Sequence, residues 1–145
     1  MYNVVFLDID GVLVCPQNKL SDKHEGLEFD SASVNVLKEI LDKFDAKLII
    51  TSSWRINKSL EQLQELFRFY GLSSYVLDKL PDFVDYMERE NAIKSYVNLK
   101  GISNYLILDD MPFETLQKNA IQTELRKGLK AIPQDTLKNI SILFK

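Results

Sequence analysis

Two aspartates, Asp8 and Asp10, stand two positions apart in the stretch VVFLDIDGVLV (4–14), directly behind a run of strand-forming apolar residues. Carboxylates at the end of a buried strand are costly unless an opposite charge neutralises them. Mg²⁺ binds through carboxylate oxygens, and a carboxylate beside such a metal can attack phosphorus to form an aspartyl-phosphate. A second carboxylate can protonate the leaving oxygen and then deprotonate water. Gly11 suits the tight turn that brings Asp10 back to such a site.

Further polar side chains stand at the ends of two later stretches that have the composition of strands. They are Thr51, Ser52 and Ser53 at and behind the end of KLIIT (47–51), and Asp109 and Asp110 at the end of NYLILDD (104–110). Because the carboxyl ends of parallel strands meet at one edge of a sheet, we expect these residues to face Asp8 and Asp10. The expected Mg²⁺ ligands then include Asp8, Asp110 and the backbone carbonyl of Asp10. The hydroxyl and amide groups behind the second strand are expected to hold phosphoryl oxygens.

The elements that must position these groups follow from apolar periodicity along the chain. It predicts strands at 3–7, 47–51, 74–78, 104–110 and 119–123, and helices that begin at Asp30 or Ser31, around Leu60, near Asp85 and at Pro133. This alternation predicts an α/β fold, a Rossmann-like three-layer sandwich with a mostly parallel sheet and helices on both faces. The length of 145 residues fits one domain over 1–145.

Composition narrows the class of protein. The chain is 46% apolar and 27% charged, and its formal net charge of −3 gives no general attraction to nucleic acid or anionic membranes. No apolar run approaches the roughly 20 residues of a membrane-spanning helix, and the first residues lack the basic region of a signal peptide. Cys15 is the single cysteine, so no internal disulfide forms. We therefore expect a cytoplasmic protein with no membrane partner.

Three motifs carry a family resemblance. FLDIDGVL (6–13) resembles the first motif, hhhDxDGx, of the haloacid dehalogenase (HAD) superfamily of phosphohydrolases, LIITSS (48–53) resembles the second, and LILDD (106–110) resembles the DD-type fourth. Their order and strand placement also match, over nearly the whole chain. ITSSWR (50–55) and IQTELRKGL (121–129) are similar to a capless branch that includes HAD domains of RNA-repair proteins. The resemblance implies a HAD-like fold without a cap domain.

The resemblance also implies roles for individual residues. Asp8 corresponds to the nucleophile and Asp10 to the general acid/base. Thr51 corresponds to the residue that holds the phosphoryl group, with Ser52 as the alternative because the register at a strand end can shift by one. Asp110 corresponds to a Mg²⁺ ligand.

The third motif of the family supplies a Lys or Arg that offsets phosphate and aspartate charge. A helix that leads into the fourth strand runs antiparallel to it, so the N-terminus of this helix faces the site. Arg89 lies in the first turn behind the expected cap Asp85, whereas Lys94 lies about 7.5 Å further along the axis. We therefore expect Arg89 in this role, with Lys94 and then Lys79 as alternatives. Asp109 is expected to orient this base or to support the metal.

Four residues around the expected site have two interpretations each. Trp54 either packs under the second helix or offers a stacking surface for a base or sugar. Arg55 either grips a second phosphate or is a solvated residue at a helix start. His24 is expected to be a solvated loop residue rather than a catalytic one. Glu114 is expected to be an exposed helix residue, with support of the metal as the alternative. Ser52, Arg55 and Lys94 are then the expected substrate-binding residues.

The segments 12–29 and 78–85, where HAD relatives insert caps, are too short here for a folded cap domain. An open site follows, and capless relatives often act on bulky phosphates. We therefore expect a Mg²⁺-dependent phosphatase that acts on a bulky phosphate, such as a nucleotide or a nucleic-acid end. The alternatives are a phosphotransferase with the same chemistry and a non-catalytic module that binds a phosphate or a partner. A response-regulator-like receiver, which is also phosphorylated on an aspartate, would carry that aspartate behind a middle strand. Here D-x-D-G follows the first strand, which disfavours a receiver.

Overall fold

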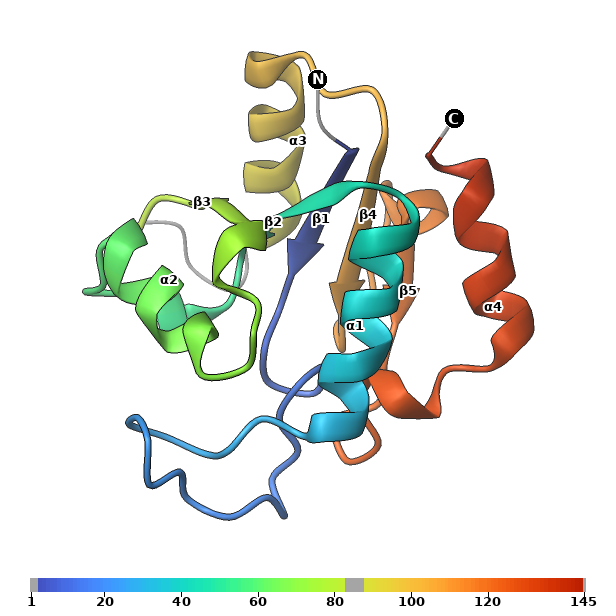
Figure 1. Ribbon diagram of the computed structural model, residues 1–145. Coiled ribbons are helices and arrows are strands. Elements are labelled where there is room, and N and C mark those ends of the chain that lie inside the picture. The colour runs from blue at the N-terminus through green and yellow to red at the C-terminus, as the bar shows by residue number, and fades with distance from the viewer. Residues whose placement is uncertain (1–2, 83–87, 145) are drawn as a thin grey trace.

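The computed structural model describes residues 3–82 and 88–144, and its strands form one sheet (Figure 1). Every pair of neighbouring strands is parallel, and the order across the sheet is β3-β2-β1-β4-β5. The strands are β1 (Asn3–Leu7), β2 (Ala46–Ile50), β3 (Val76–Lys79), β4 (Tyr105–Asp109) and β5 (Ala120–Gln122). The predicted α/β fold with a parallel sheet is therefore confirmed. The first strand has its predicted boundaries, and those of the other strands shift by one or two residues.

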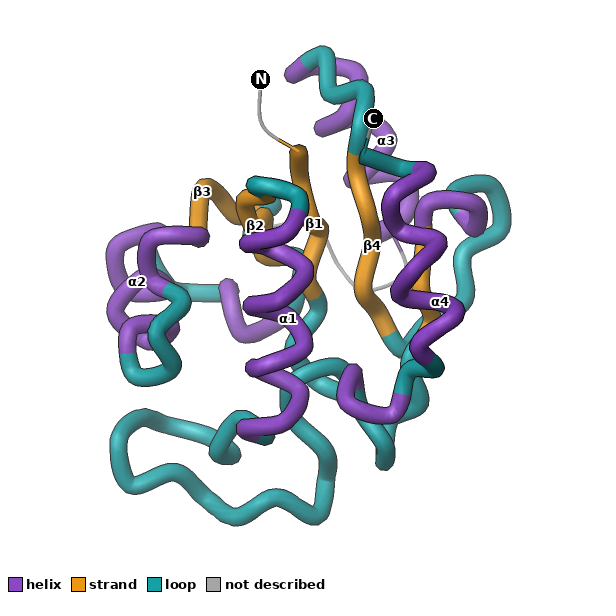
Figure 2. Tube along the Cα trace, turned by 45° about the vertical axis from the view of Figure 1, so that its right-hand side comes forward, coloured by secondary structure: helices purple, strands orange, loops and turns teal. Residues whose placement is uncertain are grey.

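Helices cover both faces of the sheet (Figures 1 and 2). They are α1 (Ser31–Lys43), α2 (Leu60–Arg68), α3 (Arg89–Lys100) and α4 (Gln134–Lys138), with short 3₁₀ helices at Ser53–Arg55, Ser73–Tyr75, Gln117–Asn119, Leu129–Ala131 and Asn139–Ile142. The chain steps from β1 to β2 to β3 in one direction and then crosses back to β4. Because such crossovers are right-handed, α1 and α2 lie on one face and α3 on the other.

Two apolar cores hold these layers together. The larger core joins α1 and α2 to alternate strand residues such as Val5, Leu7 and Ile50. The smaller core joins α3 to the strand residues that face the opposite side of the sheet, among which are Val4 and Phe6. Burial on both faces explains why these strands are continuously apolar. It also fixes the carboxyl ends of β1, β2 and β4, where the polar residues begin.

Local capping sets where the helices begin. The Asp30 side chain accepts a hydrogen bond from the backbone N–H of Ser33 (2.9 Å), so the predicted cap of α1 is confirmed. Ser59 and Gln62 form a reciprocal capping box at the start of α2. The expected cap Asp85 lies outside the described residues. The helix α3 begins at Arg89, which places this residue in its first turn.

Candidate active site

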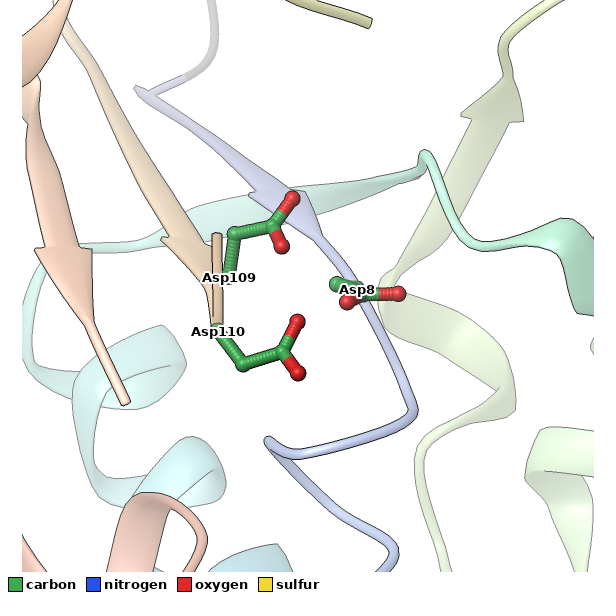
Figure 3. Close-up of side chains that lie close together, drawn as sticks. All are labelled: Asp8, Asp109 and Asp110. Atoms are coloured by element: carbon green, nitrogen blue, oxygen red, sulfur yellow. The ribbon is translucent and has the colours of Figure 1, made fainter. Parts of the chain in front are cut away.

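Three aspartates meet at the carboxyl edge of the sheet (Figure 3). Asp8 follows β1, Asp109 ends β4 and Asp110 comes next, and the carboxylates of Asp109 and Asp110 project toward the Asp8 side chain. One oxygen from each lies within 4.8 Å of the others. The backbone N–H of Asp8 donates to the carbonyl of Leu108 (2.9 Å), so the β1–β4 pairing brings them together. The convergence predicted from the strand ends is confirmed for these three residues.

Burial makes this group of carboxylates electrostatically unfavourable by itself. Asp8 is 4% exposed and Asp109 is fully buried. Burial, and next the charge of Asp109, raise the pKa of Asp8 to about 9, against the opposing effect of Arg89. Burial and Asp109 also raise the pKa of Asp110. A hard divalent cation would relieve this repulsion, and carboxylate oxygens are among the ligands that Mg²⁺ prefers. The residues present therefore fit a metal of this class.

Arg89 is the basic residue that reaches the aspartates. Its Nη1 lies 2.6 Å from Oδ2 of Asp109 and 3.4 Å from Oδ2 of Asp8, and its side chain is 8% exposed. Burial acts to lower the pKa of Arg89, but the charges of Asp8 and then Asp109 outweigh it and raise that pKa. The guanidinium is thus held in its charged form between two carboxylates, as expected for a group that offsets charge at the site.

Lys79 and Lys94, the two alternatives to Arg89, make their contacts away from the three aspartates. Nζ of Lys79 donates to the carbonyl of Lys58 (2.6 Å) and to Oδ1 of Asp82 (2.8 Å). Lys94 lines a polar cavity of about 350 Å³ beside the first turns of α3, together with Arg89 and the segment 111–115. Proximity to the aspartates therefore favours Arg89, while Lys94 stays a candidate for contact with a bound substrate.

Thr51 presents a buried hydroxyl directly behind β2. Its backbone N–H donates to the carbonyl of Leu7 (2.9 Å), which sets it beside Asp8. Thr51 is 1% exposed, and its Oγ1 has no hydrogen-bond partner in the described part of the chain. An unsatisfied buried hydroxyl costs roughly 1–3 kcal/mol. The hydroxyl of Ser52 instead accepts from the backbone N–H of Trp54 (3.2 Å). Of the two expected phosphoryl ligands, Thr51 is the one whose hydroxyl is unused.

Arg55 is buried, so its interpretation as a solvated residue is wrong. It lies in the 3₁₀ helix η1 (Ser53–Arg55), is 3% exposed, and donates to four backbone carbonyls at 2.9–3.1 Å. The acceptors are the carbonyls of Thr51, Ser52, Leu80 and Pro81. These contacts fasten the segment behind β2 to the end of β3, and they lend no support to a grip on a second phosphate.

The surroundings of Trp54 and His24 were only partly foreseen. Trp54 packs against the larger core, as one interpretation held, but its indole Nε1 also donates to Oδ1 of the exposed Asp10 (3.2 Å). His24 is half-buried rather than solvated, which corrects the expectation. Its Nε2 lies 2.5 Å from the hydroxyl of Tyr70, and its ring contacts those of Phe29 and Trp54. No local pattern in the sequence joins these residues.

Glu90 is a site residue that sequence reasoning missed. Its carboxylate accepts from the backbone N–H groups of Glu114 (3.3 Å), Thr115 (2.8 Å) and Leu116 (2.9 Å), and from the hydroxyl of Thr115 (3.1 Å). Burial acts to raise the pKa of Glu90, but these donors hold it below its usual value. Glu90 thus orders the segment behind Asp110. Glu114 itself is exposed as expected, although it lies in a bend rather than a helix.

Gly11 and Thr123 shape the turn behind β1. Gly11 has a φ of +82°, and a Cβ there would lie 2.7 Å from Cβ and Oδ2 of Asp110. Glycine therefore makes room for the Asp110 side chain. The hydroxyl of Thr123 donates to the Gly11 carbonyl (2.6 Å), and its backbone N–H donates to the Asp109 carbonyl (2.9 Å). Thr123, also missed from the sequence, ties the end of β5 to both acidic segments.

Comparison with known proteins agrees with this geometry. The family model described as "HAD domain in Swiss Army Knife RNA repair proteins" matches residues 4–132. A search of curated proteins found no match. Within the described residues, every helix is too short or too polar to cross a lipid bilayer.

Proposed function

Because the chain belongs to the family of HAD domains in Swiss Army Knife RNA repair proteins, we propose that it is a Mg²⁺-dependent phosphatase. The reaction is hydrolysis of a phosphomonoester through an aspartyl-phosphate on Asp8. The observation that carries this proposal is the buried group of Asp8, Asp109 and Asp110 with Arg89 between two of its members. Membership of a family made up mostly of phosphohydrolases supports the same activity.

The residues that would hold Mg²⁺ are Asp8, Asp110 and the backbone carbonyl of Asp10, with Asp109 in support. When bound, the ion offsets carboxylate charge and polarises the phosphoryl oxygens. Arg89 adds a fixed positive charge beside Asp8 and is the proposed basic residue of the third motif. The free hydroxyl of Thr51 donates to a phosphoryl oxygen.

The proposed reaction has two displacements at phosphorus. An oxygen of the Asp8 carboxylate attacks, the bond to the leaving oxygen breaks, and Asp10 gives its proton to that oxygen. Asp10, now a carboxylate, takes a proton from water. The resulting hydroxide attacks the phosphorus, the bond to Asp8 breaks, and inorganic phosphate leaves. The proton that Asp10 takes from water in the second step replaces the proton that it gave to the leaving oxygen in the first.

The open edge of the sheet supports a bulky substrate. Asp10 is exposed, and the chain is small and lacks a cap domain. The family match to RNA-repair proteins favours a nucleotide or a nucleic-acid end over a small metabolite. Lys94 is the proposed contact for a more distant part of this substrate, because it lines the polar cavity that extends from Arg89. If only small sugar phosphates turned over efficiently, this choice of substrate would be wrong.

Hydrolysis of an aryl phosphate, with and without Mg²⁺, tests the proposal. Asp8→Asn keeps the shape of the side chain but removes its charge, and we expect kcat to fall by at least about 10³-fold. Asp135→Asn, on the exposed surface of α4, is the matched control and should leave kcat unchanged. Turnover that survives in Asp8→Asn would contradict the proposal. If wild type were inactive on aryl phosphates and phosphorylated oligonucleotides and also bound no Mg²⁺, a non-catalytic binding module would be favoured.

A further inference from the structure

The carboxylate of Asp10 is held by a residue from a different part of the chain. Its Oδ1 accepts from the indole Nε1 of Trp54 at 3.2 Å, across 44 positions of sequence. This is the one side-chain hydrogen bond that Asp10 makes within the described residues. Asp10 lies on the turn behind β1 and Trp54 lies in η1, behind β2. The contact therefore leaves Oδ2 of Asp10 as the oxygen that faces solvent or a substrate.

The indole that makes this bond is itself fixed in place. The backbone N–H of Trp54 donates to Ser52, which caps η1. The Trp54 ring meets the rings of Phe29 and His24 edge-on, with centroids 5.6 and 6.0 Å away. A Cβ on Gly26 would lie 2.8 Å from Cη2 of Trp54, so the backbone of residue 26 lies directly against the indole. The ring has little freedom to turn while these neighbours stay in place.

The three residues that contact the indole ring, His24, Gly26 and Phe29, belong to the segment 12–29, which we term the flap. The flap is fastened to Tyr70 behind α2, whose ring stacks on Phe29 with centroids 4.2 Å apart. The Tyr70 hydroxyl accepts from the backbone N–H of Phe29 (3.2 Å) and contacts Nε2 of His24 (2.5 Å). A continuous set of contacts thus runs from Tyr70 through the flap to Trp54 and ends on Asp10.

We propose that Trp54 is a positioning residue that aims the Asp10 carboxyl group at the leaving oxygen. The indole N–H holds Oδ1, so that Oδ2 is the oxygen that exchanges protons, and the flap keeps the indole in place. Trp54 gives up no proton in either step. The inference rests on the proposed phosphatase activity.

Trp54→Phe separates the indole N–H from the packing of the ring. A nitrophenyl phosphate needs little protonation of its leaving oxygen, whereas a nucleoside 5′-phosphate, which is an alkyl ester, needs it strongly. We expect kcat/KM for the alkyl ester to fall by about 10–100-fold and that for the aryl ester to stay within about threefold. A residue that only supports the fold would lower both values equally. An unchanged ratio in an active variant would overturn the inference.

A double variant tests whether the effect passes through Asp10. Trp54→Phe added to Asp10→Asn should cause no further loss with the alkyl ester, because the group that Trp54 positions is already gone. A multiplicative loss would contradict the inference. Tyr70→Phe, which removes the hydroxyl that holds the flap, should change the same ratio in the same direction by a smaller factor.

A second readout does not depend on activity. Trp54 is the single tryptophan of the chain, so its indole N–H gives one signal in an NMR spectrum. Asp10→Ala should move this signal and speed the exchange of its proton with solvent, while Asp135→Asn should do neither. An indole signal that ignores Asp10→Ala would overturn the inference even if the protein hydrolysed phosphates. Wild-type inactivity on every ester, with the indole signal responding as expected, would instead contradict the proposed function.

Discussion

Two arginines are buried at the same edge of the sheet, and they have opposite surroundings. Arg55 donates to four neutral backbone carbonyls, and burial, with the charge of Arg89 second, lowers its pKa. Arg89 lies against Asp8 and Asp109, whose charges raise its pKa despite burial. The hydrogen bonds of Arg55 give it a structural role, in which backbone dipoles offset its burial. Arg89 belongs to a group in which carboxylates outnumber the guanidinium.

This difference indicates where chemistry takes place. With all three carboxylates ionised, as they would be around a bound metal, they and one guanidinium leave two negative charges, which one divalent cation would balance. The guanidinium of Arg55 instead donates to backbone carbonyls, which stabilise it by hydrogen bonding. Buried charge that remains uncompensated is characteristic of functional sites, whereas buried charge that is fully hydrogen-bonded mostly supports structure. The four predictions below would break or sharpen this comparison, from the largest expected effect to the smallest.

Arg89→Ala should remove catalysis. The variant loses the fixed positive charge beside Asp8, and we expect kcat at saturating Mg²⁺ to fall by about 10²–10³-fold. Lys94→Ala is the control, because Lys94 lines the neighbouring cavity without an ion pair to the aspartates, and it should affect KM more than kcat. Full turnover in Arg89→Ala together with loss of turnover in Lys94→Ala would mean that Lys94, not Arg89, is the basic residue of the third motif.

Arg55→Met should instead remove stability. Four charge-assisted hydrogen bonds are lost and their carbonyl acceptors stay behind, so the free energy of unfolding should drop by about 2–4 kcal/mol in a denaturant titration. Well below the unfolding transition, kcat should stay within about tenfold of wild type, a change of ~1.4 kcal/mol in the barrier. A variant as stable as wild type but inactive would mean that Arg55 acts in the reaction.

Asp8→Asn should make the metal-free protein more stable while it abolishes activity. Because burial and Asp109 raise the pKa of Asp8 to about 9, this carboxyl must take up a proton when the metal-free protein folds at pH 7, which costs free energy. Asn avoids this cost, so we expect the free energy of unfolding to rise by about 1–2 kcal/mol and Tm by about 3–6 °C. Mg²⁺ should raise the Tm of wild type and leave that of the variant nearly unchanged, since ligand binding stabilises only a protein that has its site. Equal stabilisation of both proteins by Mg²⁺ would place the metal elsewhere.

Glu90→Gln should have the smallest effect, and one that depends on pH. The folded pKa of Glu90 lies below its usual value, so its contribution to stability is present above that value and is lost as pH falls through the folded pKa. We expect a loss of about 1 kcal/mol at pH 7 that shrinks in acid, measured by denaturant titration at several pH values. A loss that did not change with pH would show that the charge of Glu90 is unimportant.

The sequence allowed much of this site to be predicted, for identifiable physical reasons. Asp8, Asp109 and Asp110 were predicted to meet because parallel strands place their carboxyl ends at one edge. Arg89 was expected beside them because a helix antiparallel to β4 begins at that edge. Both arguments use only regular elements, whose geometry the apolar periodicity encodes.

The remainder of the site depends on contacts between loops. The carbonyls that bind Arg55 through its Nε and Nη2 belong to Leu80 and Pro81, some 25 positions away. Trp54 meets Asp10 across a still longer separation. Turn and loop conformations at such distances leave no periodic signal in the sequence, so the burial of Arg55 and the contacts of Glu90 and His24 could not be foreseen.

Trapping of the phosphorylated protein tests the central claim most directly. Asp10→Asn should still be phosphorylated by an aryl phosphate with a good leaving group, but it lacks the base that activates water. After rapid quenching, mass spectrometry of peptides should place a hydroxylamine-labile phosphate on Asp8, and the label should be absent when Asp8→Asn is added. A phosphate on Thr51 or Ser52, or rapid turnover by wild type with no phosphate on Asp8 under any quench, would contradict the account.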